Sequence, residues 1–121
     1  MNVVLIGMPG SGKSRLGKAL AAKTGLKFFD TDALVREKYG DISDIFAKYG
    51  EDFFRRKETA AAIVAAANDG AVIATGGGIV VRPENMEILK KNALVIYLEA
   101  SVATLVGRTR KRQSRPLLSG G

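Results

Sequence analysis

Four short apolar segments alternate with amphipathic segments along the chain. The apolar segments are residues 3–6, 26–29, 71–74 and 94–98, and the third is apolar throughout, as in a strand buried on both faces. Apolar residues recur at helical spacing in residues 15–23, 33–39, 43–49 and 52–68, near 83–91 and in 101–110. Alternating strands and helices predict an α/β fold with a parallel sheet and helices on both faces.

Glycines, serines and a proline mark the predicted helix ends. We expect Gly25, Gly40, Gly50 and Gly70 to end helices, Ser43 and Ser101 to cap two others, and Pro83 to start one. In the long helix 52–68, the residues expected to face the core are Phe53, Ala60, Ile63, Val64 and Ala67.

The composition is that of one globular domain. The chain has 121 residues, with 46% hydrophobic and 26% charged residues, and no linker or repeat divides it, so we expect a single domain over residues 1–121. It contains neither cysteine nor histidine, which leaves a carboxylate, lysine, tyrosine or water as a general base. No apolar run reaches membrane-spanning length and no leader precedes the first strand, so we expect a cytoplasmic protein.

Residues 7–14 read GMPGSGKS, which matches the phosphate-binding pattern G-x-x-x-x-G-K-[ST] between a predicted strand and a predicted helix. Backbone N–H groups at Gly10, Ser11 and Gly12 would approach a polyphosphate where a Cβ would obstruct them. Lys13 would reach the β and γ phosphates, and the Ser14 hydroxyl would bind Mg²⁺. The segment predicts a nucleotide site; the alternative is a glycine-rich turn that binds nothing.

Two aspartates follow the second predicted strand. Asp30 and Asp32 are two residues apart, so in extended backbone they share one side of the sheet. Phosphoryl transfer needs one carboxylate for Mg²⁺ and another that accepts the proton of the attacking hydroxyl. The alternative is that Asp32 or Thr31 only caps the next helix.

Two further segments have a functional and a structural interpretation. The charged residues 51–58 are either a solvated helix face or include an arginine that clamps a carboxylate. Gly76, Gly77 and Gly78 form either a flexible turn or a site where a ligand comes close to the backbone. Because parallel strands end at one edge of the sheet, we expect the glycine run, the aspartates, the phosphate loop and the basic segment beyond the last predicted strand to meet there.

The C-terminal segment concentrates positive charge. The net charge is +7, and five basic residues follow the last acid, Glu99: Arg108, Arg110, Lys111, Arg112 and Arg115. No aromatic residue lies among them, so we favour a phosphate-binding loop over a nucleic-acid surface, which is the alternative for this segment alone. Residues 115–118 are either a disordered end or a lid in which Arg115 neutralises the transferring phosphoryl group.

Five segments occur in the order and approximate spacing of shikimate kinases: residues 7–14, 29–32, 50–58, 76–78 and 115–118. The chain therefore resembles this family. The resemblance implies a three-layer αβα fold of the P-loop kinase type, with four of five expected strands present. It also implies Mg²⁺-dependent transfer of the ATP γ-phosphoryl group to the 3-hydroxyl of shikimate, in the pathway to aromatic amino acids.

The resemblance assigns roles to single residues. Asp30 would hold the metal with Ser14, Asp32 would bind the acceptor hydroxyls and act as base, and Arg55 would pair with the shikimate carboxylate. The remaining assignments are Gly77 and Gly78 beside the acceptor ring, Lys13 and the lid residue Arg115 in catalysis, and Arg108 near adenine.

Members of the family continue beyond residues 111–121, which resemble the start of their mobile lid. They add a fifth strand, a second arginine for the shikimate carboxylate and a loop around adenine. We therefore expect a C-terminally incomplete domain whose exposed apolar surface costs on the order of 10 kcal/mol, and which self-associates where the full-length family is monomeric. The alternative functions are an ATP-binding remnant without turnover, a gluconate-type kinase and, more weakly, a nucleic-acid-binding module.

Overall fold

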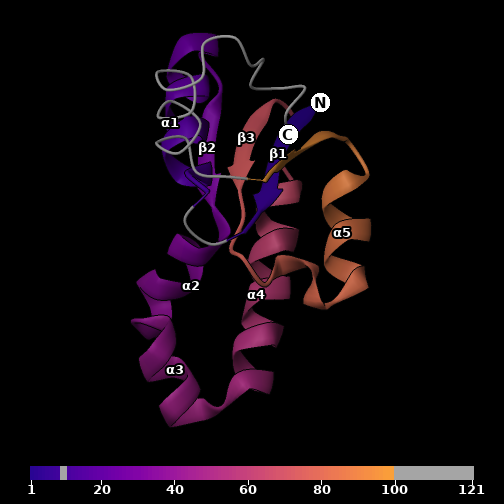
Figure 1. Ribbon diagram of the computed structural model, residues 1–121. Helices are drawn as coiled ribbons and strands as arrows, with labels where there is room; N and C mark the ends of the chain where they lie inside the picture. The colour runs from indigo at the N-terminus through magenta and orange to yellow at the C-terminus, as the bar shows by residue number, and fades with distance from the viewer. Residues whose placement is uncertain (9–10, 100–121) are drawn as a thin grey trace, which may run out of the picture.

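A four-stranded parallel sheet forms the centre of the molecule (Figure 1). The computed structural model describes residues 1–8 and 11–99. The strands are β1 (Asn2–Gly7), β2 (Lys27–Asp30), β3 (Ala71–Ala74) and β4 (Ala93–Leu98), in the order β2-β3-β1-β4. All three neighbouring pairs are parallel. The predicted parallel sheet is confirmed, with strand ends shifted by one residue for β1, β2 and β4.

Helices cover both faces of the sheet, which confirms the three-layer αβα architecture. The helices are α1 (Lys13–Thr24), α2 (Thr31–Tyr39), α3 (Ile42–Tyr49), α4 (Glu51–Ala66) and α5 (Pro83–Lys90), with a 3₁₀ turn at Ile79–Val81. One core cluster joins α1 to the sheet through Leu5, Ala21 and Val72. Another joins α4 and α5 to the opposite face through Val4, Ala62, Ile73 and Leu89.

Helices α2 and α3 and the first half of α4 extend beyond the carboxyl ends of the strands (Figure 1). Their own core consists of Val35, Ile45, Phe54 and Ala61. This cluster is separate from the two clusters that pack against the two faces of the sheet, so these helical segments have a core of their own beside the carboxyl ends of the strands.

The described residues test the predicted helix ends. Gly40 and Gly50 end α2 and α3, and Pro83 starts α5, as predicted. The prediction that Gly70 ends α4 is wrong, because that helix ends at Ala66 with Ala67 as its C-cap. Gly25 ends α1 in the left-handed conformation, with φ of 73°, as predicted. Asp30 caps α2 instead of Thr31 or Asp32. The prediction that Ser43 caps α3 is wrong, because the Ile45 N–H already donates to the Asp41 carbonyl at 2.9 Å and the helix begins at Ile42.

The predicted core face of α4 is also wrong. The buried side chains are Phe54, Glu58, Ala61, Ala62 and Ala65. Ile63 and Val64 are 53% and 57% exposed, Ala60 and Ala67 are exposed, and Phe53 alone of the predicted set packs against a core cluster. Residues 60–67 read AAAIVAAA, and an uninterrupted apolar run carries no helical phase. The face of α4 that packs closely against its neighbours carries the small alanines, and the larger Ile63 and Val64 lie on the exposed face.

Within residues 1–8 and 11–99, no helix is both long and apolar enough to cross a membrane. The helix predicted after Ser101 and the lid predicted at residues 111–121 lie outside the described residues.

Candidate active site

The loop after β1 holds the Lys13 ammonium group close to its own backbone. The Lys13 Nζ donates to the carbonyls of Gly7 and Met8, both at 2.8 Å, and to the Ser11 Oγ at 3.3 Å. Gly12 precedes α1 with φ of 88°, a conformation that favours glycine. Burial lowers the pKa of Lys13, and the nearby carboxylates of Asp32 and Asp30 oppose this shift. Gly10 lies outside the described residues.

Asp30 connects the start of α1 to the start of α2. Its Oδ1 accepts hydrogen bonds from the backbone N–H groups of Asp32 and Ala33, at 2.9 and 3.2 Å. Its Oδ2 accepts one from the Ser14 hydroxyl at 2.5 Å. Asp30 is therefore both a helix cap and the partner of the serine that ends the phosphate-loop motif.

Asp32 presents the second carboxylate of the site. It lies in the first turn of α2, half-buried, and its carboxylate accepts no hydrogen bond from any described residue. Burial and the neighbouring Asp30 carboxylate raise the pKa of Asp32, while Arg36, Lys13 and Arg55 act in the opposite direction. A carboxylate with a raised pKa and a free oxygen is suited to accept a proton.

Gly76 lies against Asp32. A Cβ built on Gly76 would collide with the Asp32 carboxylate, so this position needs a glycine for space. The Gly76 N–H donates to the Thr31 Oγ1 at 3.3 Å, and this bond fastens the loop after β3 to the start of α2. A side chain of the site thus makes the close approach at Gly76, whereas the prediction for the glycine run named a ligand or another backbone.

Arg55 lies at the other end of the glycine run. From α4, its Nη1 donates to the Gly78 carbonyl at 3.2 Å and to the Glu58 Oε1 at 3.1 Å. Its Nε contacts the Glu51 carboxylate at 3.4 Å. Among the described residues Nη2 has no hydrogen-bond partner, so the fork retains donors for a ligand.

Glu58 is the buried counterion of Arg55, with only 1% of its side chain exposed. Burial raises the pKa of Glu58, and the hydrogen bond from Arg55 opposes the rise. Its Oε2 has no hydrogen-bond partner in the described part of the chain. Glu58 belongs to the charged segment 51–58, and nothing in the sequence indicates its burial, because a pair spaced i,i+3 is typical of a solvated helix face.

The buried side-chain amide of Asn85 holds the end of the loop that contains the glycine run. Asn85, fully buried on α5, donates through Nδ2 to the Ile79 carbonyl at 2.9 Å, and its Oδ1 accepts from the Thr59 hydroxyl at 2.6 Å. This pair connects α4, α5 and the residue after the glycine run. Nothing in the local sequence indicates it, because both residues are ordinary polar positions of amphipathic helices.

The structure therefore brings together five predicted segments or residues: the phosphate loop, Asp30, Asp32, Arg55 and the run 76–78. Gly77 is exposed and Gly78 is half-buried at the mouth of this site. Arg108 and Arg115 lie outside the described residues. Within residues 1–8 and 11–99, no group of three or more acidic side chains could hold a metal. Ser14 and Asp30, joined by a hydrogen bond, present two adjacent side-chain oxygens at the start of α1.

Comparison with known proteins gives a consistent set of relatives. The family model described as shikimate kinase matches residues 9–121. The shikimate kinase of Symbiobacterium thermophilum is 50% identical over 123 residues, which cover 99% of this chain and 71% of the relative. That of Sulfurihydrogenibium sp. is 43% identical over 118 residues, with 97% and 71% covered.

Solved structures show the same likeness. Shikimate kinase from Acinetobacter baumannii in complex with shikimate is 37% identical with a TM-score of 0.79, over 95% of this chain and 65% of that one. Shikimate kinase from Aquifex aeolicus is 30% identical with a TM-score of 0.78, over 97% and 70%. A gluconokinase from Sinorhizobium meliloti, 24% identical with a TM-score of 0.58, shows similarity of fold alone. The chain spans 65–71% of the length of the shikimate kinases named here.

Proposed function

This chain belongs to the shikimate kinase family, and we propose that it transfers the γ-phosphoryl group of ATP to the 3-hydroxyl of shikimate with the residues that meet at its sheet edge. Members of this family are ATP-dependent phosphotransferases with an alcohol acceptor. One observation carries the assignment of residues. Asp32 and Arg55 lie at opposite ends of one glycine run, so a carboxylate and a guanidinium group border the same space.

Arg55 supplies the acceptor clamp. A guanidinium group binds a carboxylate through two parallel N–H donors, and burial of the partner Glu58 keeps the fork in place. Gly77 and Gly78 contribute backbone contacts to the ring of the acceptor, because without side chains the backbone can approach it. The structure of the Acinetobacter baumannii relative with shikimate supports a site for this acceptor in the shared fold.

Asp32 acts as the general base. Its free carboxylate oxygen accepts the proton of the acceptor hydroxyl while the hydroxyl oxygen forms a bond to the γ phosphorus and the bond to ADP breaks. The pKa raised by burial makes Asp32 a stronger base than an exposed aspartate. Lys13, held at the phosphate loop, stabilises the negative charge that develops on the phosphates.

The ATP phosphates lie against the backbone of Ser11 and Gly12 at the start of α1, where the helix dipole favours an anion. Ser14 and Asp30 fit a magnesium ion, because Mg²⁺ in phosphotransferases takes one or two protein oxygens and obtains its other ligands from phosphates and water. When bound, the ion neutralises phosphate charge. Gly10, Arg108 and Arg115 stay predictions for the nucleotide and lid positions.

The test is Mg²⁺-dependent release of ADP by this chain with shikimate, with gluconate or without an acceptor. We expect release with shikimate only. The Arg55→Ala variant should weaken shikimate binding by roughly 10- to 100-fold, since a charged hydrogen-bond partner is worth about 1.5–3 kcal/mol. ATP affinity should change little, because Arg55 is on α4 and not in the phosphate loop.

Other outcomes contradict the proposal in distinct ways. Release with gluconate but not shikimate would assign a different acceptor. ATP binding without ADP release for any acceptor would support a nucleotide-binding remnant. An equal loss of ATP and shikimate affinity in Arg55→Ala would mean that the arginine maintains the fold and does not clamp the acceptor.

A further inference from the structure

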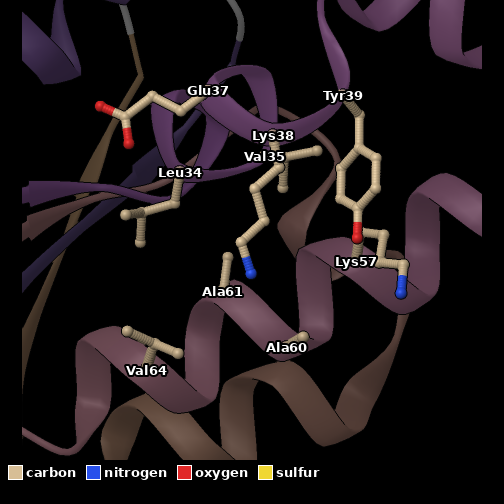
Figure 2. A pocket seen from close by; sticks show the side chains of 9 residues that line it. All are labelled: Leu34, Val35, Glu37, Lys38, Tyr39, Lys57, Ala60, Ala61 and Val64. Carbon is tan, nitrogen blue, oxygen red and sulfur yellow. The ribbon is translucent and has the colours of Figure 1, made fainter.

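A groove runs between α2 and α4 (Figure 2). Its volume is about 240 Å³. Its apolar walls are formed by side chains of both helices: Leu34, Val35, Ala60, Ala61 and Val64. None of the residues assigned to ATP or shikimate lines it. The volume lies below the 300–1,000 Å³ that is common for drug-sized ligands, so it suits a molecule with a single ring.

Two ammonium groups border this apolar space. Lys38 comes from α2 and Lys57 from α4, and neither forms an ion pair within the described part of the chain. Figure 2 shows the Lys38 Nζ reaching over the groove above Ala61, and the Lys57 side chain passing the hydroxyl end of the Tyr39 ring. The one acidic lining residue, Glu37, directs its carboxylate away from both amines in this view.

The Lys57 ammonium group is held in place by aromatic rings. It lies 5.5 Å from the centroid of Tyr39 and 5.2 Å from that of Phe53. Contacts of this kind orient a cation without neutralising its charge. The groove thus combines apolar walls, a positive charge held by aromatic rings, a second, exposed positive charge and a phenol hydroxyl at one end.

From this arrangement we propose that the groove between α2 and α4 binds a small aromatic carboxylate, at a site separate from the acceptor site. The ring occupies the space between Leu34, Ala60 and Val64. The carboxylate accepts hydrogen bonds from Lys38, Lys57 and Tyr39. The two lysines select an anion over a neutral ligand, and the short cavity excludes a fused or extended ring system.

The test is a titration of the ¹⁵N-labelled chain with phenylacetate, with 2-phenylethanol as the neutral analogue. We expect shifts of amide signals confined to residues 34–39 and 57–64, with a Kd in the millimolar range and binding of the alcohol at least threefold weaker. Lys38→Glu should weaken phenylacetate roughly 10-fold, since an exposed charge pair contributes up to about 1 kcal/mol and reversal makes it repulsive. The matched control is Lys23→Glu on the exposed surface of α1.

A second variant tests the location without changing charge. Ala60 is exposed and faces the groove, so Ala60→Leu should fill the cavity, abolish binding and leave the fold intact. Arg55→Ala should leave binding unchanged, which separates this site from a carboxylate bound in the acceptor site. Binding here does not depend on turnover.

Three results would overturn the proposal. The first is equal binding of phenylacetate and 2-phenylethanol. The second is a set of shifts centred on Asp32, Arg55 and residues 76–78 that disappears in Arg55→Ala. The third is the absence of any shift at roughly 20 mM phenylacetate, a concentration that would saturate a millimolar site.

Discussion

At the scale of single residues, the three acids of the site differ in how their oxygens are occupied. Asp30 uses one oxygen as a helix cap and the other for Ser14, and Glu58 is paired with Arg55. Asp32 alone has a carboxylate that no described residue contacts through a hydrogen bond. Hydrogen bonds thus fix two acids in place and leave the third available, which is the arrangement that a metal ligand, a counterion and a base require.

Replacing Asp32 by asparagine tests its function as base. Asp32→Asn should lower turnover by about 10²–10⁴-fold with little change in ATP affinity, because the amide cannot accept the proton. ADP release and nucleotide titration measure the two quantities. Near-normal turnover would remove Asp32 from this role.

The Asp32→Asn variant should lose turnover but gain stability relative to the wild type as the pH rises. The pKa of Asp32 is raised above its ordinary value of 3.8, so the folded state binds the proton more tightly than the unfolded state. Protonated Asp32 therefore stabilises the folded state. This stabilisation is fully present below pH 3.8 and is lost as the pH rises through the folded-state pKa of Asp32. Urea unfolding should therefore show Asp32→Asn to gain stability over the wild type on going from pH 4 to pH 7.

Substitutions in the glycine run give a further prediction for single residues. A methyl group in Gly76→Ala must displace the Asp32 carboxylate, and a displacement of about 1 Å costs on the order of 10²-fold in rate. In Gly78→Ala the methyl group meets the guanidinium group of Arg55, so the loss should fall on acceptor affinity. Steady-state kinetics separate the effects, and unchanged turnover in Gly76→Ala would contradict the assigned contact.

At the scale of elements, α4 determines much of the site, and the sequence predicted the wrong buried face for this helix. Its charged first half directs Arg55 and Glu58 towards the glycine run, and its alanine-rich second half packs against the sheet and α5. Because residues 60–67 are all apolar, the sequence could predict the helix but not its rotation about its axis. The packing partners determined that rotation, and Glu58 became buried.

The rotation of α4 has a measurable consequence. Phe54→Ala should reduce the free energy of unfolding by about 3–5 kcal/mol, because Phe54 is 3% exposed within a core cluster. Ile63→Ala should change it by no more than about 0.5 kcal/mol, because Ile63 is 53% exposed. Urea denaturation of both variants tests this, and a reversed order would support the predicted face.

The connection between α4, α5 and the glycine run depends on Asn85. Asn85→Ala leaves the Ile79 carbonyl without its donor and should cost about 2–3 kcal/mol of unfolding free energy. Asn92 is the control, since it is exposed and its side chain bonds only the Asp69 carboxylate among the described residues, and Asn92→Ala should have a small effect. Equal losses in the two variants would show that burial of Asn85 does not matter.

At the scale of the whole molecule, β4 forms one edge of the described sheet and carries exposed apolar side chains. Leu94 and Tyr97 are 53% and 56% exposed, on opposite faces of the strand. An apolar edge strand can pair with a second chain. The described surface therefore supports the prediction of self-association, which stays a prediction.

Sedimentation velocity at several protein concentrations tests this prediction. The wild-type chain should shift to larger species as its concentration rises, and Leu94→Lys should reduce the shift, because a charge on an edge strand opposes pairing. A wild-type chain that remains a monomer at every concentration would refute it. A Lys23→Glu variant, altered on a remote helix, should behave like the wild type.

The sequence by itself determined the alternation of strands and helices, the parallel sheet and the phosphate loop, because each depends on local periodicity or on a motif of fixed spacing. It also determined that Asp30, Asp32 and the glycine run meet at one sheet edge, since parallel strands all end on the same side. The tertiary structure alone decided which face of α4 is buried, that Glu58 is the counterion of Arg55, and that Asn85 supports the loop. These features depend on contacts between residues far apart in the chain, and no local pattern encodes such contacts.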